Sequence, residues 1–357
     1  MKKVVPIKVF RHRLLILDQR KLPQEMVWFE AQRAADVVYA IRHMLLRGAP
    51  LIGIAAAYGF YLEIYHEIKK GRIPTLAFAK RLKQSLDKSR PTAINLMWAT
   101  ELMLEAFRKL REKNKPGEIV NQLFAQAKFI QEDDAQRCAQ MACEALVYLE
   151  KNLPRQKYRV LTHCNTGALA TGGIGTALGL IRLLQQKGKL AMVYVGETRP
   201  YLQGARLTTW ELFREKIPVT LVVDSMAAFL MQKAEVDVVV VGADRITRRG
   251  DVANKIGTYS LSVLAKHHQI PFLVLAPEST YDGRLTFGHE IPIEERDAHE
   301  VLSFHGLKVS PPVKVKNYSF DITPRENITA IITEKGLFQG EPAFSSARAT
   351  SPSISIS

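Results

Sequence analysis

The sequence predicts an α/β protein, with a mainly helical N-terminal domain followed by a doubly wound domain on a parallel sheet. Between residues 24 and 149, apolar residues recur at steps of three and four, the period of an amphipathic helix. From residue 158 onward, short β-branched runs alternate with amphipathic stretches. Continuous apolar strands separated by helices are typical of a parallel sheet covered on both faces, which is the Rossmann-like architecture.

Four segments follow from these patterns. A chain of 357 residues exceeds one average domain, so we expect two. The end of the chain is rich in Ser and Ala without periodicity, which predicts a disordered tail. The expected segments are a helical domain with short strands at 1–118, a connecting helix at 119–150, a Rossmann-like α/β domain at 151–343 and the tail at 344–357.

The second domain has five predicted strands, and helices are expected to begin near Gly172, Gln203, Ser225 and Asn254. In this architecture ligands bind at the carboxyl ends of the strands. Functional residues are therefore sought directly after each strand. The predicted strands are 159–163, 190–195, 219–223, 236–242 and 272–276.

The positive charge is concentrated in the first third of the chain. The formal net charge is +15, and residues 1–115 hold 23 Lys and Arg against 10 Asp and Glu. Such a surplus suits a phosphorylated ligand, nucleic acid or an acidic membrane surface, and it is also what helices with solvated lysines show. We expect no nucleic-acid partner, because no basic motif with interleaved aromatic residues is present.

Neither membrane insertion nor secretion is predicted. The longest apolar runs, such as 236–241, are far shorter than a membrane span, and residues 1–20 lack the apolar stretch of a signal peptide. Three cysteines, Cys138, Cys143 and Cys164, form neither a disulfide framework nor a four-ligand zinc site. We therefore expect a cytoplasmic protein without a metal.

Two strand ends carry residues suited to acid–base chemistry. Cys164 follows the first predicted strand and precedes a glycine-rich turn, where backbone N–H groups attract anions and activate a nearby thiol. Asp244 comes just after the strand 236–242, beside apolar residues that would keep a carboxyl protonated. The structural alternatives are a small buried residue at Cys164 and an ion pair with Arg245, or a turn cap, at Asp244.

Five further side chains suit a phosphorylated sugar. The amide of Gln203 can donate to and accept from hydroxyls, and Asn254 and Lys255 are expected at the start of a helix, where they could hold a phosphate or hydroxyl. Arg47 and Arg90 lie in rigid turns, and the guanidinium fork matches phosphate. A helix cap at Gln203 and surface charges at the arginines are the alternatives.

A dinucleotide-binding loop is the main rival interpretation of the glycine-rich segment. Gly173, Gly175 and Gly179 have a similar pattern, and Glu197 follows at the end of the next strand. In that loop, however, the first glycine comes directly after the strand, whereas residues 165–172 intervene here. We therefore expect no nucleotide cofactor.

Taken together, these segments resemble the methylthioribose-1-phosphate isomerase family. Its relatives include ribose-1,5-bisphosphate isomerases and the regulatory subunits of eukaryotic translation initiation factor 2B. The similarity extends from Leu17 to Gly336. Its most specific segments are 47–50, 90–96, 162–167, 197–200, 242–246 and 250–259.

The resemblance implies a homodimer with its site between the domains and an aldose–ketose isomerase of methionine salvage, without metal or nucleotide cofactor. The implied substrate is 5-methylthioribose 1-phosphate. Ribose 1,5-bisphosphate, 5-deoxyribose 1-phosphate and a non-enzymatic translation-factor role remain alternatives. The translation-factor subunits generally lack the cysteine and aspartate present here, which favours an enzyme. The resemblance implies Cys164 and Asp244 as the catalytic pair and, as substrate contacts, Arg47, Gly48, Ala49, Arg90, Gln203, Asn254 and Lys255.

One departure from the family pattern falls near the expected site. Arg248 and Arg249 stand where family members usually carry small or polar residues. Because they follow Asp244 closely, we expect them near the bound substrate and able to influence its identity.

Overall fold

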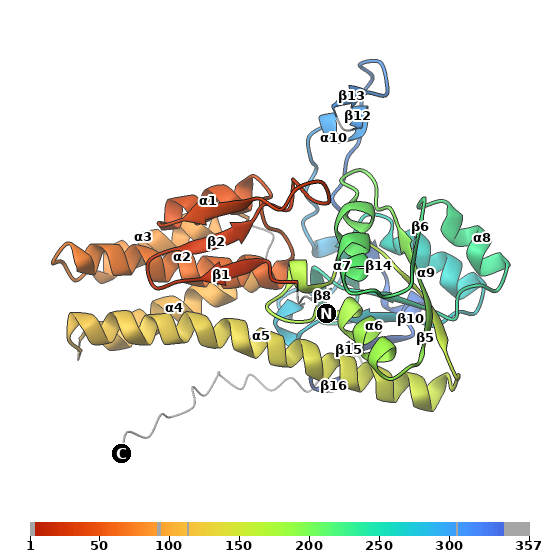
Figure 1. Ribbon diagram of the computed structural model, residues 1–357, viewed down its shortest axis with the longest axis horizontal. Coiled ribbons are helices and arrows are strands. Elements are labelled where there is room, and N and C mark those ends of the chain that lie inside the picture. The colour runs from red at the N-terminus through yellow and green to blue at the C-terminus, as the bar shows by residue number, and fades with distance from the viewer. Residues whose placement is uncertain (1–3, 91–93, 113, 305, 339–357) are drawn as a thin grey trace.

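The computed structural model describes residues 4–90, 94–112, 114–304 and 306–338. It shows a helical N-terminal lobe beside a C-terminal lobe built on a twisted sheet, with one long helix running along both (Figure 1). The expected tail at 344–357 lies outside the described residues.

The N-terminal lobe combines a small antiparallel sheet, in the order β1-β2-β3, with helices. Strand β3 falls in a region where the sequence predicts mainly helix. It is four residues long, and its pairing with β2 outweighs the local periodicity. The elements are β1 (Ile7–Val9), β2 (Leu14–Leu17), β3 (Trp28–Ala31), α1 (Ala34–Arg42), α2 (Ala49–Lys69), α3 (Leu76–Asp87), α4 (Ile94–Arg111) and α5 (Pro116–Asn152).

Helix α2 forms the centre of this lobe. It packs against α1, α4 and α5 and is apolar on nearly every side, as a fully enclosed helix must be. Gly53 allows the close approach of α4, because a Cβ atom there would lie 2.6 Å from the carbonyl oxygen of Asn95. Phe60 of α2 meets Phe107 of α4 edge to face, with ring centroids 6.4 Å apart, and both side chains are fully buried.

The C-terminal lobe is built on a seven-stranded sheet in the order β16-β15-β10-β7-β4-β5-β6. All neighbours are parallel except β16, which pairs antiparallel with β15. The five predicted strands are confirmed within two residues at each end. The strands are β4 (Tyr158–Thr162), β5 (Leu190–Gly196), β6 (Val219–Val222), β7 (Val238–Val241), β10 (Phe272–Leu275), β15 (Ala330–Thr333) and β16 (Gly336–Phe338).

Helices cover both faces of this sheet, as the apolar strands require. Alternate strand residues divide between two cores: Val238 and Val240 face the one with α5 and α6, whereas Val239 and Val241 face the one with α8 and α9. The helices are α6 (Ala177–Gln186), α7 (Thr209–Arg214), α8 (Met226–Gln232) and α9 (Thr258–His267), with a π-helical turn at Gly204–Thr208 and 3₁₀ turns at Ala168–Ala170, Glu278–Thr280, Gly288–Glu290 and Arg325–Asn327.

The strand order reverses at the centre of the sheet. The chain enters at β4, proceeds outward through β5 to the edge strand β6, and then returns to place β7 on the other side of β4. Loops leaving β4 and β7 therefore turn away from each other and leave a crevice at the carboxyl ends of these strands. This crevice faces the N-terminal lobe.

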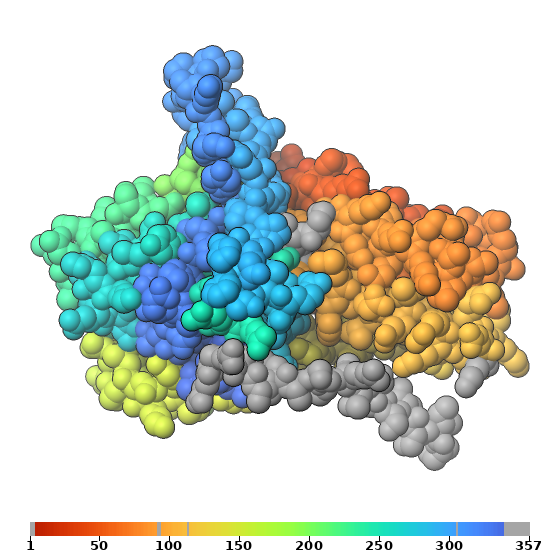
Figure 2. All heavy atoms as spheres, turned by 180° about the vertical axis from the view of Figure 1, so that it is seen from behind, coloured from red at the N-terminus to blue at the C-terminus, as the bar shows by residue number. Residues whose placement is uncertain are grey.

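A smaller sheet and a projecting arm complete the lobe. The four-stranded sheet, ordered β11-β8-β9-β14, adjoins the crevice, and the arm stands out from the body in both views (Figures 1 and 2). The sheet strands are β8 (Arg245–Thr247), β9 (Val252–Lys255), β11 (Tyr281–Asp282) and β14 (Phe320–Thr323); the arm contains α10 (His299–Leu302), β12 (Ser303–Phe304) and β13 (Leu307–Lys308).

Two expected helix starts are wrong. Asn254 and Lys255 do not open a helix but end strand β9, where they pair with Asp321 and Phe320 of β14. The helix begins only at Thr258, after Gly257 takes a φ of 102° that favours glycine. The helix expected near residue 172 begins at Ala177, because the glycine-rich segment first makes an irregular loop with a 3₁₀ turn.

Most buried apolar residues form separate cores in the two lobes, and a small cluster joins Leu17 and Leu22 of the N-terminal lobe to Leu169 and Leu207 of the C-terminal lobe. One core runs from Ile7 to Ile130, and another runs from Ala145 to Ile332, with α5 contributing to both. This separation supports the two-domain division, which stays a prediction. In the described part of the chain, every helix is too short or too polar to cross a membrane.

Replacing Phe107 with alanine tests the central packing of the N-terminal lobe. Removing a fully buried phenylalanine leaves a cavity, so we expect Phe107→Ala to reduce the free energy of unfolding by about 3–5 kcal/mol. Phe129→Ala on α5 is the matched control, because that side chain is 49% exposed, and its effect should stay within about 0.5 kcal/mol. Urea denaturation followed by circular dichroism measures both, and equal effects would contradict the assigned core.

Candidate active site

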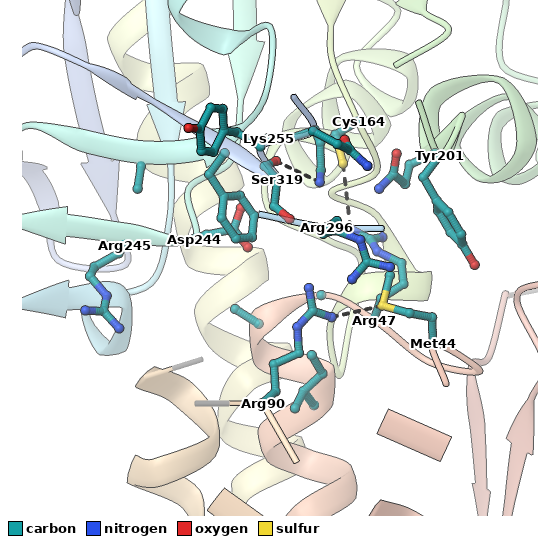
Figure 3. Close-up of a pocket in the computed structure, with 18 of the residues that line it drawn as sticks. Met44, Arg47, Arg90, Cys164, Tyr201, Asp244, Arg245, Lys255, Arg296 and Ser319 are labelled. Carbon is teal, nitrogen blue, oxygen red and sulfur yellow. Dashed lines mark hydrogen bonds between the residues drawn. The ribbon is translucent and has the colours of Figure 1, made fainter. Parts of the chain in front are cut away.

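A pocket opens at the crevice between the two lobes, above the carboxyl ends of β4 and β7 (Figure 3). About 890 Å³ of space, including open solvent at its mouth, is not filled by protein atoms. Both lobes and the base of the arm supply its walls. The lining residues are Met44, Arg47, Gly48, Ala49, Ile52, Arg90, Cys164, Pro200, Tyr201, Gln203, Asp244, Arg245, Ala253, Lys255, Ile291, Pro292, Arg296, Glu300, Asn317, Tyr318, Ser319 and Phe320.

Cys164 lies two residues beyond β4, in a backbone conformation that residues other than glycine rarely adopt. Its φ is 60°, in the left-handed region. Hydrogen bonds on both sides fix this geometry: its N–H donates to Oγ1 of Thr198 at 2.9 Å, and its carbonyl accepts from Oγ1 of Thr208 at 2.6 Å. Strained backbone that its surroundings hold in place is typical of functional sites. The thiol thus has a defined position in the pocket wall.

Asp244 lies three residues beyond β7, on the neighbouring strand of the switch point. Burial raises the pKa of its carboxyl, and the positive charges of Lys255, Arg90 and Arg47 only partly oppose this. The alternative of an ion pair with Arg245 is not what the structure shows. Nη1 of Arg245 lies 3.6 Å from Asp282, and its side chain points away from Asp244 (Figure 3). Asp244 therefore holds its proton more readily than an exposed aspartate does.

Arg47 connects the two lobes at the pocket. It precedes helix α2, yet its guanidinium donates to Oδ1 and to the carbonyl oxygen of Asn165, at 2.5 and 2.8 Å. The same group lies 3.8 Å from Sγ of Cys164. At the neighbouring Gly48, φ is 97° and a Cβ atom would lie 2.5 Å from the Cβ of Ala170. The close approach of Gly48 to Ala170 packs the start of α2 directly against the loop that follows Cys164.

Two further positive groups face the same space. Nη1 of Arg90 lies 3.0 Å from Sδ of Met44, and Nζ of Lys255 donates to the carbonyl oxygen of Ser319 at 2.9 Å (Figure 3). Burial lowers the pKa of both the Arg90 guanidinium and the Lys255 amine. Each cation is thus held by a neutral partner, which leaves its charge available to an anionic ligand.

Gln203 offers an amide to a ligand. Its side chain is only 2% exposed, and Oε1 has no hydrogen-bond partner among the described residues. A buried polar atom without a partner costs free energy unless a ligand or water satisfies it. Because Gln203 lines the pocket, a hydroxyl of a bound sugar can supply that bond.

The structure brings together eight of the nine residues singled out from the sequence. Asn254 is the exception, since it lies outside the pocket wall and its amide donates to Oγ1 of Thr258 at 3.0 Å. Arg248 and Arg249, expected beside the substrate, are exposed and do not line the pocket. The loop that carries them turns outward after β8, and the guanidinium of Arg249 lies over the ring of Phe287.

Sequence reasoning missed the wall that the base of the arm contributes. Arg296 and Glu300 form an ion pair at 2.5 Å, and the amide of Asn317 donates to Glu300 at 3.1 Å. Arg296 and Asn317 lie outside helices and strands, and Glu300 lies in the four-residue helix α10, so the sequence shows no periodic pattern that would identify them. Their place at the pocket follows only from the way the arm folds back on β14.

Comparisons with known proteins agree with this geometry. Residues 45–340 match the Initiation factor 2 subunit family. A methylthioribose-1-phosphate isomerase from Sulfurihydrogenibium sp. is 51% identical over 95% of this chain and 94% of its own length, and one from Caldicellulosiruptor saccharolyticus is 50% identical over 91% and 93%.

Solved structures show the same similarity. The 5-methylthioribose 1-phosphate isomerase from Pyrococcus horikoshii superposes with a TM-score of 0.85 at 38% identity, covering 94% of this chain and 93% of that one. A structure from A. fulgidus described as translation initiation factor eIF-2B, subunit delta, gives a TM-score of 0.78 at 39% identity, covering 94% and 96%. The chain therefore belongs to the methylthioribose-1-phosphate isomerase family, within the broader Initiation factor 2 subunit family.

Proposed function

We propose that this protein converts 5-methylthioribose 1-phosphate into 5-methylthioribulose 1-phosphate, a step of methionine salvage. The observation that carries the proposal is that Cys164 and Asp244, from adjacent strands, line one pocket together with Arg47, Arg90 and Lys255, for which the described residues show no ion pair within 4 Å. The names and identities of the relatives support it.

The phosphate group would bind at the N-terminal lobe. Arg47 and Arg90 approach the pocket from that lobe, and Gly48 and Ala49 place the start of helix α2 in its wall. No side chain among the described residues caps this helix start. Free backbone N–H groups and the positive end of the helix dipole favour a phosphate there, and the arginine forks add directed hydrogen bonds.

A sugar whose anomeric oxygen carries phosphate cannot open its ring as a free sugar does. In our proposal Asp244 protonates the ring oxygen while the bond from C1 to that oxygen breaks. The thiolate of Cys164 then takes the proton from C2, which leaves an enol phosphate. Asp244 regains a proton from the hydroxyl on C2 as the ketone forms, and Cys164 returns its proton to C1. Two protons are transferred and recovered, so the net reaction is an isomerisation.

A hydride shift from C2 to C1 is the alternative to proton transfer by Cys164. In that route the hydrogen moves with its electron pair to the electron-poor C1 after ring opening, and the hydroxyl on C2 loses its proton. Turnover in deuterium oxide distinguishes the routes. The thiolate route places solvent deuterium at C1 of the product to the extent that the thiol exchanges with solvent before it returns the proton, whereas the hydride route leaves C1 without exchange.

Conservative substitutions test the catalytic pair. General acid–base groups contribute about 10²–10⁴-fold, so Cys164→Ser and Asp244→Asn should each reduce kcat by at least about 100-fold with little change in KM. The matched controls are Cys143→Ser, at an exposed cysteine of α5, and Asp133→Asn, at an i,i+4 ion pair with Arg137 on the same helix. Both controls should turn over at close to the wild-type rate.

Near wild-type turnover in either active-site variant would show that the substituted residue takes no part in the chemical step. Steady-state kinetics on the purified chain alone also addresses the translation-factor alternative, since a regulatory subunit would convert no sugar phosphate by itself.

The rest of the pocket wall includes apolar residues and a neutralised cation. Ile52 and Ile291 line the pocket, and Arg296, the additional cation of the arm, is already neutralised by Glu300 and Glu294. An uncharged methylthio group suits such a wall, whereas a second phosphate needs unpaired cations. This arrangement favours 5-methylthioribose 1-phosphate over ribose 1,5-bisphosphate.

A direct comparison of three sugars tests this preference. We expect kcat/KM to be highest for 5-methylthioribose 1-phosphate and about 10-fold or more lower for 5-deoxyribose 1-phosphate, which lacks the apolar group. The kcat/KM for ribose 1,5-bisphosphate should be lower still, because its second phosphate would be buried without a partner. Equal or better turnover of the bisphosphate would show that the assignment of the substrate is wrong.

We also propose that the protein works as a homodimer in the cytoplasm. The three cysteines are unpaired, which suits a reducing compartment. Support for a dimer comes from the edge strand β6 and the adjoining helices α7 and α8, which together expose several large apolar side chains. These are Phe213, Leu221, Val223, Met226 and Phe229. Exposed apolar residues on and beside an open sheet edge are typical of a protein–protein interface.

Sedimentation equilibrium tests the dimer. The wild-type protein should sediment with twice the mass of one chain, and Phe229→Glu should shift it toward the monomer by burying a charge in the contact. Leu337→Glu is the matched control, since Leu337 is similarly exposed on β16 at the opposite edge of the sheet. A monomeric wild type, or dissociation by the control instead, would contradict this interface.

A further inference from the structure

Glu211 lies beneath the active-site loop and outside the pocket itself. It is in the middle of α7, its side chain is fully buried, and four N–H groups surround its carboxylate. Oε1 accepts from Nδ2 of Asn165 at 2.8 Å and from the N–H of Leu169 at 3.1 Å. Oε2 accepts from the N–H of Ala168 at 2.8 Å and from Nη2 of Arg182 at 2.7 Å. Both oxygens are therefore fully used as acceptors.

Arg182 is the charged partner of this buried carboxylate, with Nη2 2.7 Å from Oε2. Its guanidinium also donates twice to Glu215, at 2.6 and 2.8 Å, and to the carbonyl oxygen of Ile174. Burial alone would lower the pKa of Arg182, but the carboxylates of Glu211 and Glu215 outweigh it and raise that pKa. A buried charge is tolerated where partners satisfy it in this way.

Asn165 links Glu211 to the pocket through two hydrogen bonds of its side-chain amide. Because its amide nitrogen donates to Glu211, its amide oxygen must point the other way, where it accepts from Arg47. The loop packs tightly against Glu211 at Gly167. A Cβ atom on Gly167 would collide with Oε2 of Glu211, so only glycine lets the loop wrap the carboxylate so closely. Asn165 also follows Cys164 directly, so the same loop carries the thiol.

We propose that Glu211 is the positioning residue of this active site: through Asn165 and the loop it orients Arg47 toward the phosphate and fixes the backbone of Cys164. It contacts neither substrate nor reacting atoms, and it acts across the lobe boundary, because Arg47 belongs to the N-terminal lobe. The inference rests on the proposed function in that it identifies the bound anion as the phosphate of the sugar.

The donor pattern explains why glutamate is required and why glutamine cannot replace it. In Glu211→Gln, one oxygen becomes an NH₂ group. Whichever oxygen is lost, that NH₂ faces two N–H donors, either Asn165 with Leu169 or Ala168 with Arg182. The variant therefore loses two charge-assisted hydrogen bonds and gains a donor–donor repulsion, although its size and shape are unchanged.

Binding of inorganic phosphate, measured by calorimetry, tests the link to Arg47 without requiring turnover. We expect Glu211→Gln to weaken phosphate binding by about 10-fold or more, and to raise KM and lower kcat together, since hydrogen bonds to charged groups are worth about that much. Glu215→Gln is the matched control: it removes a buried carboxylate from the same arginine, but Glu215 has no hydrogen bond to the loop among the described contacts. Its phosphate affinity and kcat should stay within about twofold of wild type.

A compensating variant separates positioning from simple loss of stability. Glu211→Gln combined with Asn165→Asp keeps the net charge and exchanges donor for acceptor at the contact between the two side chains. The outer oxygen of the introduced carboxylate would still accept from Arg47. Phosphate affinity should recover in part relative to Glu211→Gln alone. If Glu211→Gln does not fold, Asn165→Ala removes the same link without disturbing Arg182 and should weaken phosphate binding similarly.

The outcomes distinguish this inference from the proposed function. Phosphate affinity unchanged in both Glu211→Gln and Asn165→Ala would overturn the role of Glu211, even if the wild type isomerises its sugar as proposed. A similar loss in Glu215→Gln would also overturn it, because the effect would then belong to the buried charge cluster as a whole. If the wild type turns over no sugar phosphate but Glu211→Gln still weakens the binding of inorganic phosphate, the proposed substrate fails and the positioning role stands.

Discussion

The reversal of strand order between β4 and β7 is the constraint on which the rest of the structure depends. It places the ends of two adjacent parallel strands at a crevice, and each end is followed by one residue of the proposed catalytic pair, Cys164 and Asp244. The N-terminal lobe closes the crevice with Arg47 and the start of α2. Everything proposed about chemistry follows from this meeting of a thiol, an acid and a group of cations in one space.

The pocket is also where the chain departs from locally favourable choices. Cys164 and Thr198 both have a positive φ, the amide oxygen of Gln203 has no partner among the described residues, and several cations are buried. Such conflicts persist where function requires them and the surroundings hold them in place. Here the surroundings are the hydroxyls of Thr198 and Thr208 and the carboxylate of Glu211, which form hydrogen bonds with the backbone of the loop.

Much of this arrangement could be predicted from the sequence, because apolar β-branched runs identify buried parallel strands and the rule for such sheets identifies their functional edge. Cys164 and Asp244 were found in this way. Lys255 was found for the wrong reason, since its helix is a strand whose pairing with β14 is invisible to local patterns. The arm residues Arg296 and Glu300, and the loop support from Glu211, were missed because they depend on contacts between distant segments.

A crystal structure of the Asp244→Asn variant with 5-methylthioribose 1-phosphate bound would test the account most directly. It predicts one sugar in the pocket, with its phosphate on Arg47 and Arg90, its ring oxygen against residue 244 and its C2 facing the sulfur of Cys164. A sugar bound with C2 remote from the sulfur, or with its ring oxygen away from residue 244, would contradict the account.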